Sequence, residues 1–296
     1  MNAYFLSLNP EANALRQWDA GFLLDFLKGN MWQPSNWQDF EIKEVTSLPK
    51  DERAIVVIPA RHHKGLEEQV NKELQHIDNV VLFCLGDEEA EFYIEKIQHP
   101  SIHIWIQNGH IGKHDNYNKI GTGYPQHIKQ FLSDKIKKDL NMYFAGQVTH
   151  QRRLELIDVA LHYEAEVGDS RVVRTKGFTQ GEPPKDYYKY MCRAKVVPCP
   201  SGAIIPDSFR FFEALECMSI PVADTKTPTG EVMHYWDWLF NEEIPIPQVS
   251  EWDRLYGIMY ESLENWPMNM HRQTAWWILF KRKFANKVWE QLCQVI

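Results

Sequence analysis

Three polar side chains stand at the start of one predicted helix, within the stretch CPSGAIIPDSFRFFEALECMSIPVAD at residues 199–224. Ser208, Arg210 and Glu213 follow one apolar strand and precede another. A helix that begins at the carboxyl end of a strand presents N–H groups and the positive end of its dipole to an anion. A guanidinium at that position can pair bidentately with phosphate oxygens. The pattern therefore predicts a phosphate site that includes Ser208 and Arg210.

Two further residues extend this site toward a nucleotide. Glu213 lies three residues after Arg210, so both side chains share one helix face, and its carboxylate can accept hydrogen bonds from two ribose hydroxyls. Gly202 allows the backbone to approach a ligand closely. Phosphate beside ribose describes a nucleoside diphosphate. The alternative is that Arg210 and Glu213 form an ordinary surface ion pair of small energetic value.

Two segments of the chain are similar to exostosin-like glycosyltransferases. Residues 188–224, YKYMCRAKVVPCPSGAIIPDSFRFFEALECMSIPVAD, resemble the donor-binding segment of that family, and YFAGQVTHQRRLELI at residues 143–157 resembles its upstream element. The resemblance implies a GT-B enzyme with two Rossmann-like domains that face a central cleft and a donor held by the C-terminal domain.

The resemblance also implies a role for each matched donor-site residue. Arg210 and Ser208 would hold the diphosphate, Glu213 would bind the ribose, and Arg152 or Arg153 would supply a second positive contact. By analogy with two-domain transferases, the loop after the second strand of the C-terminal half would lie near the nucleobase, with Lys176 as a contact.

Glycosyl transfer requires charge stabilisation of the leaving diphosphate and, for an inverting enzyme, a general base. Arginines and a helix start can meet the leaving-group charge, and no DxD motif stands at a strand end, so we predict no obligatory metal. Asp19, between the first strand and its helix, is the first candidate base, although it could instead cap that helix. His110 and Asp115, in the polar loop QNGHIGKHDNYN, are the other candidates, and His110 could also be an ordinary loop histidine.

Short apolar runs alternate with helical segments along most of the chain, which predicts an α/β fold with doubly wound parallel sheets. The N-terminal runs are residues 4–8, 54–58, 80–85 and 102–106, with a weaker strand at 40–45 and an expected helix at 88–97. A second series starts after a charged segment at residues 133–140. We therefore expect an acceptor domain at residues 1–139, a nucleotide-sugar domain at 140–266 and a long C-terminal helix at 267–296.

Composition limits the remaining classes. The 296-residue chain has a net charge of −8, which disfavours a broad electrostatic grip on nucleic acid. Its five cysteines form no CxxC pair, which argues against zinc and for a reducing compartment. The sequence has no recognisable secretion signal and no apolar run of the roughly 20 residues that a membrane helix needs. These features predict a soluble, cytoplasmic protein.

The sequence thus predicts a glycosyltransferase that moves a sugar from a nucleotide-diphosphate donor, with a UDP-sugar preferred. The acceptor is either a glycan or a hydroxylated base in DNA. The main alternative is a non-catalytic module that binds a sugar nucleotide or docks a partner. An NAD enzyme is disfavoured because SLNPEANAL, rather than GxGxxG, follows the first strand.

Overall fold

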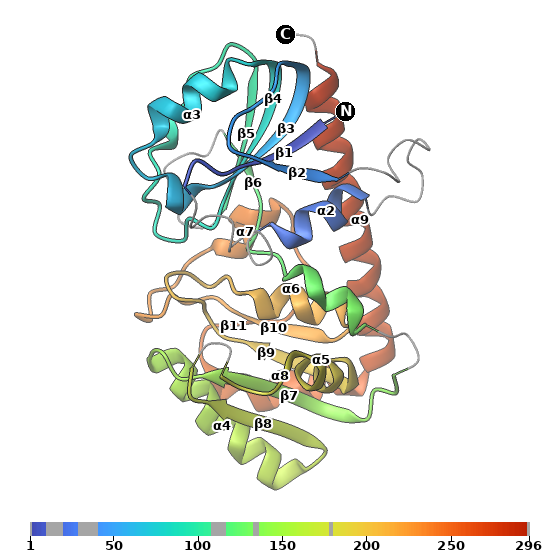
Figure 1. Ribbon diagram of the computed structural model, residues 1–296. Helices are drawn as coiled ribbons and strands as arrows, with labels where there is room; N and C mark the ends of the chain where they lie inside the picture. Colours follow the sequence, from blue (N-terminus) through green and yellow to red (C-terminus); the bar gives the residue numbers. More distant parts are fainter. Residues whose placement is uncertain are drawn as a thin grey trace. The chain divides into compact units, whose positions relative to one another are not determined.

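The computed structural model describes residues 2–9, 20–28, 41–107, 117–132, 136–177 and 180–294. The described chain is α/β, with two sheets of parallel strands and a long C-terminal helix (Figure 1). Two compact units share it: unit 1 is residues 1–126 with 278–296, and unit 2 is residues 127–277. The chain thus passes between units after Gln126 and after Trp277, whereas the sequence placed domain borders after residues 139 and 266.

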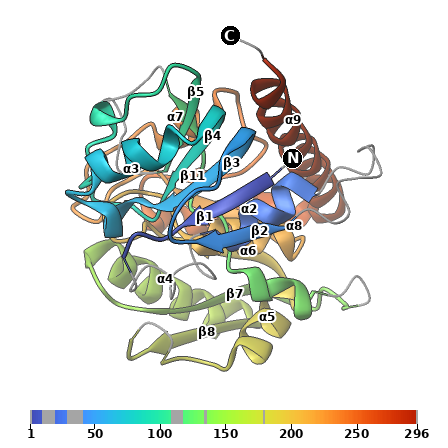
Figure 2. The same ribbon diagram turned by 45° about the horizontal axis from the view of Figure 1, so that its top comes forward.

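Unit 1 contains a six-stranded parallel sheet in the order β2-β1-β3-β4-β5-β6. Its strands are β1 Asn2–Leu6, β2 Ile42–Val45, β3 Asp51–Pro59, β4 Ile77–Leu85, β5 Ile102–Ile106 and β6 Asn118–Lys119. The apolar runs within β3 and β4 are fully buried because helices cover both faces of the sheet. Figure 2 shows α3 (Glu67–Leu74) on one side of this sheet and α2 (Gly21–Lys28) on the other.

Unit 2 contains a five-stranded parallel sheet in the order β11-β10-β9-β7-β8. Its strands are β7 Leu140–Gln147, β8 Ser170–Thr175, β9 Ala194–Cys199, β10 Ile220–Asp224 and β11 Gln248–Val249. Its α-helices are α4 Gln151–Val167, α5 Pro184–Arg193, α6 Phe209–Glu216, α7 Tyr235–Phe240, α8 Leu255–Glu264 and the first part of α9 Trp266–Cys293.

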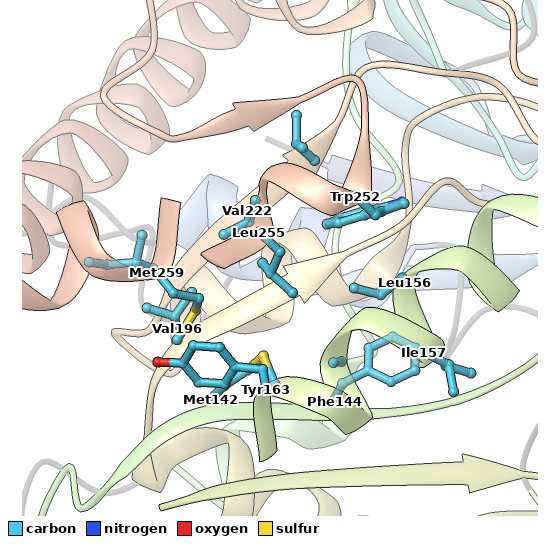
Figure 3. Close-up of a cluster of buried hydrophobic side chains, with 13 residues drawn as sticks. Met142, Phe144, Leu156, Ile157, Tyr163, Val196, Val222, Trp252, Leu255 and Met259 are labelled. Atoms are coloured by element: carbon cyan, nitrogen blue, oxygen red, sulfur yellow. The ribbon is translucent and has the colours of Figure 1, made fainter. Parts of the chain in front are cut away.

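One buried cluster fixes how the unit 2 helices pack (Figure 3). Met142 and Phe144 of β7 meet Leu156 of α4 and Leu255 of α8, so α4 and α8 cover the same face of the sheet. Tyr143 lies between two cluster residues in β7 and therefore faces the other way. There its ring packs against tyrosines of α5, which places α5 on the opposite face.

Helix α9 contributes to the core of each unit. In unit 2, Trp277 is buried and its Nε1 donates to Glu216 Oε1 at 2.7 Å. In unit 1, Phe284 packs edge-on against Trp105 at a ring-centroid distance of 4.7 Å, and Trp105 Nε1 donates to Gln291 Oε1 at 2.9 Å. The predicted C-terminal helix is confirmed. None of the described helices is long and apolar enough to cross a membrane.

The expected helix at residues 88–97 is wrong, since only the 3₁₀ turn η4 Ile94–Lys96 forms there. The Asp87 carboxylate accepts hydrogen bonds from the backbone N–H groups of Glu91 and Phe92, at 2.9 and 3.0 Å. Ala90 also has a left-handed φ of 53°. Side-chain acceptors thus satisfy backbone donors that an α-helix would otherwise pair internally.

Candidate phosphate-binding site

The carboxyl ends of β7 and β9 form the switch point of the unit 2 sheet. Numbered within the unit, the strands lie in the order 2-1-3-4-5, which is the flavodoxin-like order of doubly wound sheets. Removal of the third strand from the Rossmann order 3-2-1-4-5-6 gives the same arrangement, so the sheet is compatible with the predicted Rossmann-like fold. Ligands of open α/β sheets bind at the carboxyl ends of the strands, where the strand order reverses. A ligand site of unit 2 is therefore expected at this edge.

Arg210 lies at this edge, in the first turn of α6. Its Nη2 donates to the carbonyl oxygen of Ala145 in β7 at 2.6 Å, and its guanidinium carbon lies 4.7 Å from the ring centre of Phe144. A Cβ atom on Gly146 would lie 2.9 Å from Nη2, so glycine leaves room for the guanidinium. Nε of Arg210 is buried and unpaired, and no carboxylate in the described ranges forms a salt bridge with this arginine.

The β9–α6 loop brings Gly202 and Ser208 to the same edge. The N–H of Gly202 donates to the carbonyl of Ile205 at 2.9 Å, and a Cβ atom at position 202 would lie 2.3 Å from the carbonyl oxygen of Asp207. Only glycine therefore fits this turn without a backbone shift. Ser208 is the N-cap residue of α6, yet its hydroxyl makes no capping bond and is buried without a partner.

The start of α4, which follows β7, supplies His150 and Arg153. His150 is the N-cap residue of α4, and its Nε2 lies 3.2 Å from the carbonyl oxygen of Ser201. Arg153 donates to that same carbonyl oxygen through Nε and Nη2, both at 3.2 Å. Ser201 is fully buried and its hydroxyl is unpaired. Neither His150 nor Ser201 was among the predicted site residues, although both lie between a strand end and a helix start.

We call these seven residues the switch-point cluster: they come from two segments, residues 146–153 and 201–210, and share the carboxyl edge of β7 and β9. The members are Gly146, His150, Arg153, Ser201, Gly202, Ser208 and Arg210. The cluster combines two guanidinium groups, one imidazole and two hydroxyls with the starts of two helices. These groups are hydrogen-bond donors or positive in character, which is the chemistry that a phosphate or other oxyanion requires.

Arg152 and Arg153 are adjacent but have different surroundings. Arg152 is 3% exposed, and its guanidinium pairs with Asp224 at 2.7 Å and with Glu155 at 2.8 Å. Asp224 is itself fully buried. The charge of Arg152 is therefore neutralised by carboxylates of the protein itself. Arg153, which contacts Ser201 in the cluster, is the better candidate for the predicted second positive contact to the diphosphate.

Glu213 is buried beneath α5. Its Oε2 accepts a hydrogen bond from Tyr187 at 2.8 Å and its Oε1 accepts one from Tyr188 at 2.7 Å. Burial raises the pKa of Glu213, while the two tyrosine hydroxyls and the nearby Arg210 act in the opposite direction. Both carboxylate oxygens thus have partners in this structure, and a ribose would have to displace a tyrosine. The ribose-binding role of Glu213 stays a prediction.

Lys176, the predicted nucleobase contact, is not brought into the cluster. Lys176 is exposed after the end of β8. Asp19, His110 and Asp115, the three candidate bases, lie outside the described residues. Within the described ranges, no group of three or more histidine, cysteine, aspartate or glutamate side chains is placed to hold a metal ion.

At the corresponding edge of unit 1, the described side chains of His63 and Gln107 have hydrogen-bond partners. Its switch point lies between β1 and β3, where the N–H of Leu8 donates to His63 Nε2 at 3.1 Å and His63 Nδ1 donates to the carbonyl oxygen of Pro59 at 3.0 Å. The Gln107 amide has a partner at each end: Oε1 accepts from the Gly86 N–H at 2.6 Å, and Nε2 donates to the Gly121 carbonyl oxygen at 2.9 Å. Among the described residues, Arg210 Nε and the hydroxyls of Ser201 and Ser208 are buried donors without partners at the switch point of unit 2.

Comparison with known proteins adds no family. No protein-family model matches this chain, and no curated protein sequence matches it.

Proposed function

We propose that unit 2 binds the diphosphate of a sugar nucleotide and that the protein is a glycosyltransferase. One observation carries the proposal: Arg210 Nε and the hydroxyls of Ser201 and Ser208 are buried at the switch point without hydrogen-bond partners. A buried unpaired donor costs about 1–3 kcal/mol, so a protein that keeps several together has a reason to do so. A bound diphosphate would satisfy them, because its oxygens are strong acceptors.

The class of ligand follows from the charge of the site. Arg210 has no salt bridge to a carboxylate in the described part of the chain, and its Nε has no hydrogen-bond partner, so the guanidinium can donate to an anion. The starts of α4 and α6 add partial positive charge. A UDP-sugar is the donor that we favour, from the resemblance of residues 143–157 and 188–224 to exostosin-like glycosyltransferases. The GT-B arrangement and an acceptor that is a glycan or a hydroxylated DNA base are parts of this same proposal.

The first experiment measures thermal stabilisation by nucleoside diphosphates. At 100 times its dissociation constant, a ligand stabilises the folded protein by about 2.7 kcal/mol, which corresponds to a rise in Tm of roughly 5 to 10 °C. We expect UDP to produce this shift in the wild type and not in Arg210→Ala. Arg254→Ala is the matched control, because Arg254 is an exposed arginine of unit 2 outside the cluster.

A turnover assay then distinguishes a glycosyltransferase from a protein that only binds the sugar nucleotide. Release of UDP from UDP-sugars would be measured with glycan acceptors and with DNA that carries hydroxymethylated bases. Transfer that is lost in Arg210→Ala and kept in Arg254→Ala supports the transferase. Stabilisation by UDP without transfer to any acceptor favours the non-catalytic sugar-nucleotide module. If no nucleoside diphosphate shifts the wild-type Tm, the proposed site is refuted.

A further inference from the structure

We infer that the Nδ1 atom of His150 contacts a phosphate oxygen of the bound ligand and takes up a proton when that ligand binds. The inference rests on the proposed phosphate site and adds a residue and a pH dependence to it. It starts from the position of the imidazole, at the N-cap of α4 and beside the β9–α6 loop.

The contact with Ser201 fixes which ring nitrogen carries the proton in the free protein. A carbonyl oxygen can only accept, so His150 Nε2 must be the donor in the 3.2 Å contact with the Ser201 carbonyl. In the neutral ring Nδ1 is then an acceptor. It is buried, and no donor in the described chain bonds to it. The N-cap position offers the helix N–H groups nearby, yet the His150 side chain makes no capping bond.

Protonation turns Nδ1 into a donor, which is what a phosphate oxygen requires. In the free protein the pKa of His150 is lowered, first by burial and then by the positive charge of Arg153. The backbone contacts with Ser201 and Gly202 and the carboxylate of Asp224 oppose this effect. Because the Asp224 carboxylate is paired with Arg152 at 2.7 Å, its effect on His150 is small, and the pKa of the imidazole stays lowered. An anion at Nδ1 would add a negative charge in direct contact and raise the pKa of the ring.

The sign of the linkage follows from these two states. Because the pKa is lower in the free protein than in the complex, binding takes up a proton at any pH between the two values. Affinity therefore falls as the pH rises through that interval, by up to tenfold for each pH unit. The effect belongs to His150 and not to the ligand when the ligand itself has no titrating group near neutrality.

The test uses UDP-glucose and inorganic sulfate, neither of which titrates between pH 5.5 and 8.5. Calorimetry in buffers of different ionisation enthalpy would measure proton uptake on binding to the wild type, to His150→Gln and to His162→Gln. Glutamine retains a donor for the Ser201 carbonyl but does not titrate. His162 is exposed on the same helix, with Nδ1 2.7 Å from the Asp158 carbonyl oxygen, and serves as the matched control.

We expect uptake of up to one proton and at least tenfold tighter binding at pH 5.5 than at pH 8.5 in the wild type and in His162→Gln. His150→Gln should bind with neither effect. The ¹⁵N resonance of His150 Nδ1 in the wild type should move from the unprotonated to the protonated range on sulfate addition, which does not depend on how the variant folds. Binding with the same pH dependence in His150→Gln, or an unshifted Nδ1 resonance in the complex, overturns the role of His150 alone. Absence of binding by both probes overturns the phosphate site as well.

Discussion

Replacement of Arg152 by methionine should destabilise unit 2 because it leaves a buried carboxylate without its counter-ion. Asp224 is fully buried, and its Oδ1 accepts from Arg152 Nη2 at 2.7 Å and from the Lys226 N–H at 3.1 Å. Its Oδ2 accepts from the Ser201 N–H at 3.3 Å. Methionine keeps an unbranched side chain at a position that is 3% exposed, so the change removes charge with little change in packing.

The magnitude follows from what remains around Asp224. Removal of one partner of a buried ion pair costs about 3 to 5 kcal/mol. Two backbone N–H groups still donate to the carboxylate in the variant, so we expect the lower end, about 3 kcal/mol. With a urea m-value of about 2 kcal/mol/M, the midpoint of unfolding would fall by about 1.5 M.

Urea unfolding followed by circular dichroism would measure this loss, and a double-mutant cycle would assign it to the pair. Asp224→Asn neutralises the carboxylate, so Arg152→Met combined with Asp224→Asn should cost less than the two single changes together, by at least about 1 kcal/mol. Arg153→Met, in the neighbouring residue, removes bonds to the Ser201 and Gln147 carbonyls and leaves the Arg152–Asp224 pair in place, so it should cost less than Arg152→Met. A cost below about 1 kcal/mol for Arg152→Met, or strict additivity in the cycle, would refute the assignment of Arg152 to a structural pair.

Two more predictions concern backbone space and a buried amine. Gly202→Ala places a Cβ atom 2.3 Å from the Asp207 carbonyl oxygen, so the β9–α6 loop must shift. The variant should lose its stabilisation by UDP, and its free energy of unfolding should fall by about 1–3 kcal/mol. Gly257→Ala is the control, because a Cβ atom at this helical position meets no other atom and should raise the free energy of unfolding by about 0.5–1 kcal/mol. Retained UDP binding in Gly202→Ala would contradict the close packing of this loop. Lys138 Nζ donates to two backbone carbonyls and to Ser219, and burial lowers its pKa to about 8. Because the lysine of the unfolded chain keeps its proton to higher pH, the free energy of unfolding of the wild type should rise by about 2 kcal/mol relative to that of Lys138→Met between about pH 8 and 10. Chemical denaturation would measure this difference, and a difference that does not vary with pH would show that the amine is not desolvated.

The strands could be predicted because their apolar runs reflect burial on both faces of a parallel sheet. All of the predicted N-terminal runs overlap observed strands, and so does the weaker run at residues 40–45. The short strands β6 and β11 were not predicted, since two residues carry no periodicity. The failed helix at residues 88–97 has helical composition, but Asp87 captures its backbone donors through a local turn that composition does not reveal.

The candidate site could be predicted only in its local part. Gly202, Ser208 and Arg210 are close in sequence, and the structure places them at one edge because a strand end and a helix start adjoin there. Sequence alone does not choose between Arg152 and Arg153, because the choice depends on where Asp224 lies, seventy-two residues from Arg152 along the chain. The tyrosine partners of Glu213 come from α5, and such tertiary contacts leave no mark on the spacing around Glu213 itself.

The division of α9 between the two units has a consequence for synthesis on the ribosome. Unit 1 begins with the first residues of the chain but lacks Phe284 and Gln291 until after all of unit 2 has been made. At about 5 to 20 residues per second, the roughly 150 residues of unit 2 delay these partners by about 8 to 30 s. During that interval the side of the nascent sheet that carries Phe83 and Trp105 has no α9 to cover it. The part of unit 1 that precedes unit 2 therefore completes its core only with a segment that is made after all of unit 2.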